Sequence, residues 1–101
     1  MTRIALLLVL LLPACVSPAP DMFGATRSDI TLRGIRFVVF HSDSGAEVVR
    51  TGYLSRARRA PVQSLMAEAA EQATGCKVIP GSFTTRLPGD TGVARMDLSC
   101  P

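Results

Sequence analysis

The side-chain types of a hydrolytic triad stand together at one place in this chain. His41, Ser42 and Asp43 follow one another directly, and Ser44 comes next. A triad needs a base that reaches the nucleophile and an acid that orients the base, and side chains this close in sequence rarely converge on one reacting atom. Asp43 and Gly45 also do not make a calcium loop, because the remaining oxygen ligands are missing. We therefore interpret the group as a polar turn and expect no enzymatic activity.

A cluster of arginines is the second group whose side chains suggest chemistry. Arg56, Arg58 and Arg59 lie within four residues of one another, and Arg50 shortly precedes them. Guanidinium groups bind phosphate through two parallel hydrogen bonds, so the cluster is a candidate contact for an anionic surface such as lipid or lipopolysaccharide phosphate. The alternative, which the sequence favours, is a solvated connection that leads into a helix.

The first residues have the three zones of a secretory signal peptide: a basic start, an apolar run over 4–12, and small residues before Cys15. A helix that spans a bilayer needs about twenty apolar residues, and a proline interrupts this run well before that length. The sequence Leu12-Pro13-Ala14-Cys15 resembles the lipobox of bacterial lipoproteins, which has leucine three positions before an invariant cysteine and a small residue just before it.

This resemblance implies that the chain is cut before Cys15, whose thiol receives a diacylglyceryl group and whose new amino group is acylated, typically with palmitate. Two or three acyl chains on one residue make a permanent anchor, because each buried methylene contributes about 0.8 kcal/mol. Val16 and Ser17 follow the cysteine, where an aspartate would retain such a protein in the inner membrane. We therefore expect a cell-envelope protein on the periplasmic face of the outer membrane. The expected partners are that membrane and another envelope protein.

Apart from Cys15, the chain has two cysteines, Cys76 and Cys100, and the envelope is an oxidising compartment. They begin and end a hairpin-like section, so a disulfide would pin the C-terminus against the preceding helix and add roughly 3–4 kcal/mol of stability. The alternatives are free thiols, a redox pair or metal ligands. Redox pairs commonly have the spacing Cys-x-x-Cys, and zinc needs four ligands, where only His41 would join the thiols. A structural disulfide is favoured, and we expect no metal and no cofactor.

Without residues 1–14 the chain has 87 of its 101 residues, which is the size of one small domain. The eleven basic and eight acidic side chains become ten and eight without Arg3, a net charge of +2. So mild a charge predicts no nucleic-acid partner. Residues 15–28 contain Pro18, Pro20 and Gly24 and show no periodic pattern, so we interpret them as the lipidated cysteine and a flexible linker. The folded domain is expected over 29–101.

The clearest predicted element is a helix that begins at Pro61 and ends before a left-handed cap at Gly75. Its apolar residues recur at helical spacing: Val62, Leu65, Met66, Ala69 and Ala73. Before the helix, strand-like alternation over 30–39 slips by one residue at Gly34. This slip indicates either a β-bulge or the boundary between two short strands. Further strands are expected over 48–51, 76–79 and 94–100.

The expected order of two strands, a helix and two strands makes an α+β domain: a small antiparallel sheet of about four strands with one helix packed on one face. The other face is expected to expose apolar residues, which the register would select from Val38, Phe40, Val49 and Tyr53. An exposed apolar face often marks a partner surface. We therefore expect a non-enzymatic binding or assembly accessory at the membrane. The alternatives are a small-ligand carrier and a small periplasmic enzyme or redox protein.

Overall fold

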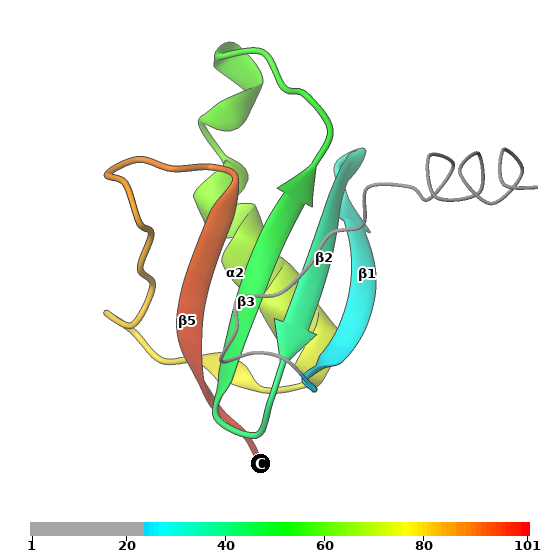
Figure 1. The fold of residues 1–101 in the computed structure, drawn as a ribbon, viewed down its shortest axis with the longest axis vertical. Helices are drawn as coiled ribbons and strands as arrows, with labels where there is room; N and C mark the ends of the chain where they lie inside the picture. The colour runs from blue at the N-terminus through cyan, green and yellow to red at the C-terminus, as the bar shows by residue number, and fades with distance from the viewer. Residues whose placement is uncertain (1–23) are drawn as a thin grey trace, which may run out of the picture.

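The computed structural model describes residues 24–101, which form an antiparallel five-stranded sheet with a helix packed on one face (Figure 1). The elements in chain order are β1 (Thr26–Leu32), β2 (Ile35–His41), β3 (Gly45–Thr51), the short 3-10 helix η2 (Ala57–Arg59), α2 (Val62–Thr74), β4 (Lys77–Val78) and β5 (Val93–Ser99). Across the sheet the strands lie in the order β1-β2-β3-β5-β4. The α+β class is as predicted, but the sheet has five strands rather than about four.

The fifth strand is found where the sequence alternation slips at Gly34, because the segment 30–39 forms parts of two strands rather than one. β1 and β2 form a tight hairpin in which Leu32 pairs with Ile35, so that only Arg33 and Gly34 lie between the strands. Both turn residues have positive φ, 52° and 77°, as in the two-residue turns whose twist matches that of the flanking strands. Because paired residues share a face, this turn places Leu32 and Ile35 on the same side although they are three positions apart. The β-bulge interpretation is therefore wrong, and the alternative of two separate strands is confirmed.

β1 begins before position 29, where the folded domain was expected to start. Thr26 pairs with His41 and Ser28 with Val39, so the last residues assigned to the linker are strand residues. Apolar and polar residues alternate only from Asp29 onward, which is why the pattern did not reveal the earlier start. The lipobox, Cys15 and the remainder of the predicted linker lie outside the described residues.

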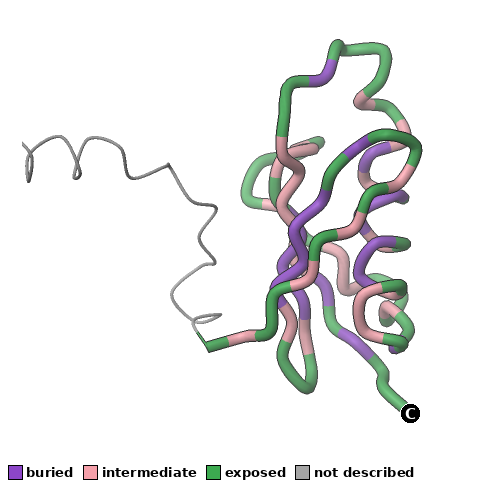
Figure 2. The backbone as a smooth tube through the Cα atoms, turned by 90° about the vertical axis from the view of Figure 1, so that its right-hand side faces the viewer, coloured by how far each residue is buried: buried purple, intermediate pink, exposed green. Residues whose placement is uncertain are grey.

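α2 covers one face of the sheet, and buried segments concentrate where the helix and the sheet face each other (Figure 2). The helix begins at Val62, with Pro61 as its N-cap, and Gly75 is the predicted left-handed cap, with a φ of 73°. The buried helix residues are Val62, Leu65, Met66, Ala69 and Ala70. They pack against sheet residues that include Phe37, Val39, Val48 and Met96. The predicted stripe is confirmed except that Ala70 takes the fully buried place expected for Ala73, which is half-buried.

The far face of the sheet carries a second, smaller apolar cluster. Because strand residues alternate between faces, Val38 and Phe40 lie opposite the helix-covered side. Each is only 4% exposed, and Ala25 and Val49 pack against them. Val38, Phe40 and Val49 therefore lie outside the helix-covered core, as expected, but Val38 and Phe40 are buried rather than exposed.

A charged pair lies on the same far face. Glu47 is 5% exposed and pairs across β3 and β5 with Arg95, whose Nε lies 3.7 Å from the Glu47 carboxylate. Opposite charges that face each other directly across two strands stabilise the sheet modestly. The far face thus combines an apolar patch with an ion pair and is not a uniform apolar surface.

Candidate binding surface

The strand register defines two ends of the domain. At one end Arg36 pairs with Thr51, and β5 begins opposite Val49. At the other end His41 pairs with Ala46, and Gly45 pairs with Asp97. We call the first the basic end, made of residues 33–36, 50–61 and 89–92. We call the second the disulfide end, made of residues 41–45, 74–77 and 97–100.

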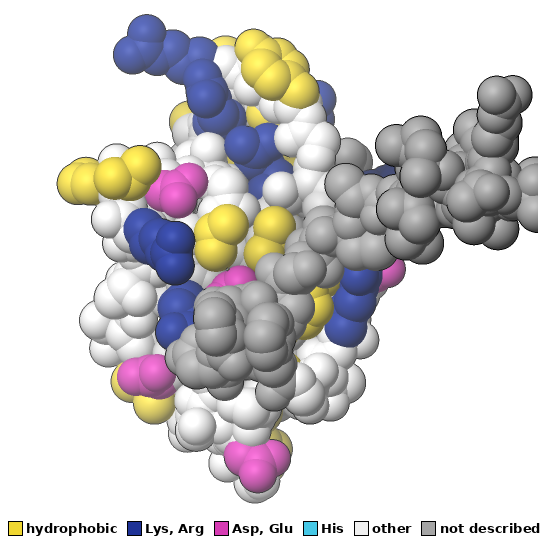
Figure 3. All heavy atoms as spheres, in the orientation of Figure 1, with side chains coloured by type: hydrophobic (Ala, Val, Ile, Leu, Met, Phe, Trp, Pro, Cys, Tyr) yellow, Lys and Arg dark blue, Asp and Glu magenta, His cyan; other side chains and the backbone are white. Residues whose placement is uncertain are grey.

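The basic end holds a concentration of arginine. Six arginines lie there: Arg33, Arg36, Arg50, Arg56, Arg58 and Arg59. Asp90 is also at this end, and its carboxylate accepts a hydrogen bond from the Gly92 N–H at 2.7 Å. In Figure 3, Lys and Arg side chains gather at the top of the view over the connection between β3 and α2, and acidic side chains are scattered over the rest of this face, including its bottom. Asp43 and Asp97 are exposed residues of the disulfide end.

One buried leucine positions the loop that carries three of these six arginines. Leu54 is 7% exposed and belongs to the main core, whereas the preceding Tyr53 is 90% exposed. The chain then winds into η2, where the Arg58 N–H donates to the Ser55 carbonyl at 3.1 Å. Arg56 and Arg58 are exposed on this short helix and its cap. A single apolar side chain thus holds an exposed aromatic ring and exposed guanidinium groups on one loop.

Arg50 has a different role from the arginines that follow it. Its Nε donates to the Thr91 carbonyl at 2.9 Å, and its Nη1 donates to the Gly52 carbonyl at 2.6 Å. The Arg50 N–H also donates to the Gly92 carbonyl at 2.8 Å. These bonds join the end of β3 to the segment that leads into β5. The structure therefore brings three of the four predicted anion-contact arginines together and assigns the fourth to bracing the backbone.

Arg56 and Arg59 line a shallow surface hollow of about 350 Å³ together with Gln63 and Thr91. The Gln63 side-chain amide donates to the Asp90 carbonyl at 3.0 Å. This bond links α2 to the segment 89–91, whose first and last residues also line the hollow. The first turn of α2 carries no acidic residue. In residues 24–101, the ion pairs are made elsewhere, and none involves an arginine of η2 or its cap. The charges of Arg56, Arg58 and Arg59 are therefore not paired with carboxylates of the described chain.

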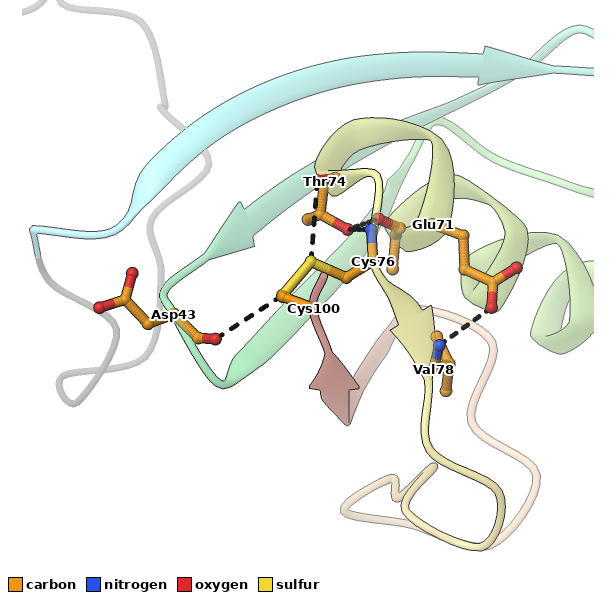
Figure 4. Close-up of a disulfide and its surroundings, with 7 residues drawn as sticks. Asp43, Glu71, Thr74, Cys76, Val78 and Cys100 are labelled. Atoms are coloured by element: carbon orange, nitrogen blue, oxygen red, sulfur yellow. Dashed lines mark hydrogen bonds between the residues drawn. A yellow bond between two sulfur atoms is a disulfide. The ribbon is translucent and has the colours of Figure 1, made fainter.

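The disulfide end is closed by internal bonds (Figure 4). Cys76 and Cys100 form the predicted disulfide, which joins the residue after the α2 cap to the residue after β5. The Thr74 hydroxyl donates to the Ala70 carbonyl at 2.7 Å and accepts from the Cys76 N–H at 3.1 Å. The Glu71 carboxylate accepts from the Val78 N–H at 2.9 Å, which ties β4 to the helix. The cross-link confirms that the C-terminal strand is pinned against the end of α2.

Ser42, Asp43 and Ser44 form the predicted turn between β2 and β3, and His41 is the last residue of β2. The Ser42 N–H donates to the Gly45 carbonyl, and the Leu98 N–H donates to the Ser44 carbonyl, both at 2.9 Å. Within the described part of the chain, no side-chain hydrogen bond links His41, Ser42 and Asp43 to one another. The same range contains no group of three or more His, Cys, Asp or Glu residues placed to hold a metal ion.

Sequence reasoning did not include Arg33, Arg36 or Tyr53 in the basic surface. The β1–β2 turn and the pairing of Arg36 with Thr51 bring the first two to this end. The one-residue slip at Gly34 was the available signal, because a two-residue hairpin produces it. Tyr53 was considered only as a sheet residue, and its place in the loop follows from β3 ending at Thr51.

The predicted lipid-attachment residue, Cys15, lies outside the described residues. The predicted anion-contact arginines lie within them, at the basic end. Neither helix in the described range has the length and apolar character needed to cross a bilayer. Comparisons of the chain with protein-family models, with curated proteins and with solved structures found no significant match.

Proposed function

We propose that this chain is a lipid-anchored protein of the cell envelope whose domain acts as a non-enzymatic binding or assembly accessory. Acyl chains on Cys15 hold it at the periplasmic face of the outer membrane. The basic end carries the binding role, because its arginines on η2 form no ion pair within residues 24–101 and lie beside a 90% exposed tyrosine. Neighbouring positive charges repel one another, so folding alone does not account for gathering them at one end.

The other functions considered have less support. Redox-active cysteines commonly form a Cys-x-x-Cys pair with an accessible thiol, whereas Cys76 and Cys100 are separated by 24 positions and Cys76 is buried. A carrier for a small ligand needs an enclosed and mostly apolar cavity. The space between α2 and the sheet is filled by fully buried side chains such as Phe37 and Met66. A hollow of about 410 Å³ beside β3 and β5 is open and lined mainly by polar residues.

The anchor is tested by the intact mass of the protein purified from membranes, with and without reduction and alkylation. The expected species begins at Cys15, carries acyl chains, and takes up alkylating agent at two thiols only after reduction. A chain that carries no acyl group would overturn the anchored part of the proposal.

The binding role is tested by photo-cross-linking in cells. A photoreactive phenylalanine analogue replaces Tyr53, whose ring it resembles, and a control chain carries the analogue at Glu68, which is exposed on α2 away from the basic end. Adducts with an envelope component are expected from position 53 and not from position 68. Equal labelling from both positions, or none from position 53, would contradict a specific role for the basic end.

A further inference from the structure

We infer that the basic end binds the phosphate groups of an anionic bilayer surface, with the Tyr53 ring in the interfacial layer beside η2. This inference rests on the proposed function and names the ligand chemistry of the same surface. It uses Arg56, Arg58 and Arg59 and excludes Arg50, whose guanidinium group is held by two backbone carbonyls.

The arrangement of the arginines fits an extended surface better than a single ion. A site for one phosphate ion gathers buried donors around one point. Here Arg56 and Arg58 are exposed, Arg59 is half-buried, and the hollow that Arg56 and Arg59 line is shallow. Guanidinium groups that stand side by side on an exposed loop can each bind the phosphate of a different lipid.

Tyr53 indicates a membrane rather than a soluble polyanion. Its ring is 90% exposed although its neighbour Leu54 is buried in the core. A tyrosine has an apolar ring with a polar tip, and such side chains are enriched at the boundary between lipid and water. The loop from Tyr53 to Arg58 therefore offers both of the groups that an anionic bilayer surface accommodates, an amphipathic ring and cationic heads.

The proposed anchor leaves this surface within reach of the same bilayer. β1 begins at Thr26 at the disulfide end, eleven residues after Cys15. Eleven extended residues span up to about 36–40 Å, whereas a strand of seven residues spans about 24 Å. The chain between Cys15 and Thr26 is therefore long enough to let the domain lie beside the membrane with its basic end in contact.

The chain contains a built-in probe for this contact. Tyr53 is its single tyrosine and it has no tryptophan, so tyrosine fluorescence reports on the basic end alone. The acylated protein, as purified from membranes, is reconstituted into vesicles of phosphatidylcholine, with or without phosphatidylglycerol, and the fluorescence is quenched by acrylamide. We expect the quenching constant to fall about two-fold when phosphatidylglycerol is present and to recover at about 0.5 M salt, where charges are screened. Equal quenching in both kinds of vesicle would overturn the inference.

Two double variants separate a local effect from one of net charge. R56Q/R58Q removes two positive charges from the basic end, and R27Q/K77Q removes two from exposed positions elsewhere in the sheet. We expect R56Q/R58Q to lose the protection of Tyr53 and R27Q/K77Q to retain it. Loss of protection in both variants would show that net charge alone attracts the protein, which contradicts a localised site. Circular dichroism checks that both variants are folded.

A competition arm distinguishes lipid phosphate from free phosphate. Inorganic phosphate is added to protein in phosphatidylcholine vesicles at constant ionic strength, and no change in Tyr53 quenching is expected. Protection by phosphate alone would replace the lipid surface by an ion site. The intact mass distinguishes failure of the inference from failure of the proposed function: an acylated protein with an unprotected Tyr53 contradicts only the former.

Discussion

The disulfide end and the basic end of this sheet use their polar groups in opposite ways. At the disulfide end the Glu71 carboxylate and the Thr74 hydroxyl bind backbone groups, and Cys76 is bonded to Cys100. At the basic end Arg50 alone of the four clustered arginines binds backbone carbonyls, while the arginines of η2 do not form ion pairs within the described chain. The comparison separates polar groups that stabilise the fold by binding the backbone from arginines that are exposed to solvent on its surface. Four variants test that separation.

The largest effect is expected at the disulfide. Replacing both cysteines (C76A/C100A) opens a loop with a sequence separation of 24, and the chain-entropy model gives a loss of roughly 3–4 kcal/mol in the free energy of unfolding. Urea denaturation followed by circular dichroism measures the change. The wild-type protein under a reducing agent is the control and is expected to match the variant. A loss below about 1 kcal/mol would show that the disulfide end is held mainly by its hydrogen bonds.

Arg50→Ala is expected to lower the free energy of unfolding by about 2 kcal/mol, because two charge-assisted hydrogen bonds to backbone carbonyls disappear. The same denaturation experiment measures it. In anionic vesicles, Tyr53 of this variant should still be protected from acrylamide quenching at a temperature where the variant is folded. If Arg50→Ala leaves stability unchanged and abolishes that protection, Arg50 contributes to binding like the exposed arginines and does not brace the backbone.

Thr74→Val retains the shape of the side chain and removes its hydroxyl. The Cys76 N–H then loses its acceptor and the Ala70 carbonyl loses one donor, so a decrease of about 1 kcal/mol is expected. Thr51→Val is the matched control, since its hydroxyl makes only a long, exposed bond of 3.3 Å to the Arg36 carbonyl. The two variants should differ in their urea midpoints, and equal midpoints would argue against a specific contribution from the Thr74 bonds.

The smallest effect on stability is expected where the effect on binding is greatest. Replacing Arg56 and Arg58 by glutamine should change the free energy of unfolding by less than about 0.5 kcal/mol, because both side chains are exposed and form no ion pair within residues 24–101. Thermal denaturation of this double variant and of the wild type measures the difference. A decrease above about 1 kcal/mol would show that these arginines support the fold.

Local patterns were sufficient to predict the helix and its cap, because apolar spacing and a glycine at the end of the stripe report directly on backbone geometry. The partner of Cys76 was predicted because the expected oxidising compartment and the count of cysteines left few alternatives. The role of Arg50 in bracing the backbone could not be predicted from local patterns, because its acceptor, the Thr91 carbonyl, is 41 residues away in sequence. Strand alternation likewise reports which face a residue occupies and not which turn joins two strands, so the one-residue slip at Gly34 did not identify the β1–β2 hairpin.

The unequal distribution of charge between the two ends gives the domain an electric dipole along its strands. Arginines dominate at one end, and at the other the exposed Asp43 and Asp97 outnumber the exposed Lys77. Near a negatively charged surface such a dipole experiences a torque before any atoms touch, so that encounters occur in a preferred orientation. The range of this effect is set by ionic strength, because the screening length is about 10 Å at 0.1 M salt and about 3 Å at 1 M. Low ionic strength therefore favours an approach in the preferred orientation, and at high ionic strength the domain approaches the surface in any orientation.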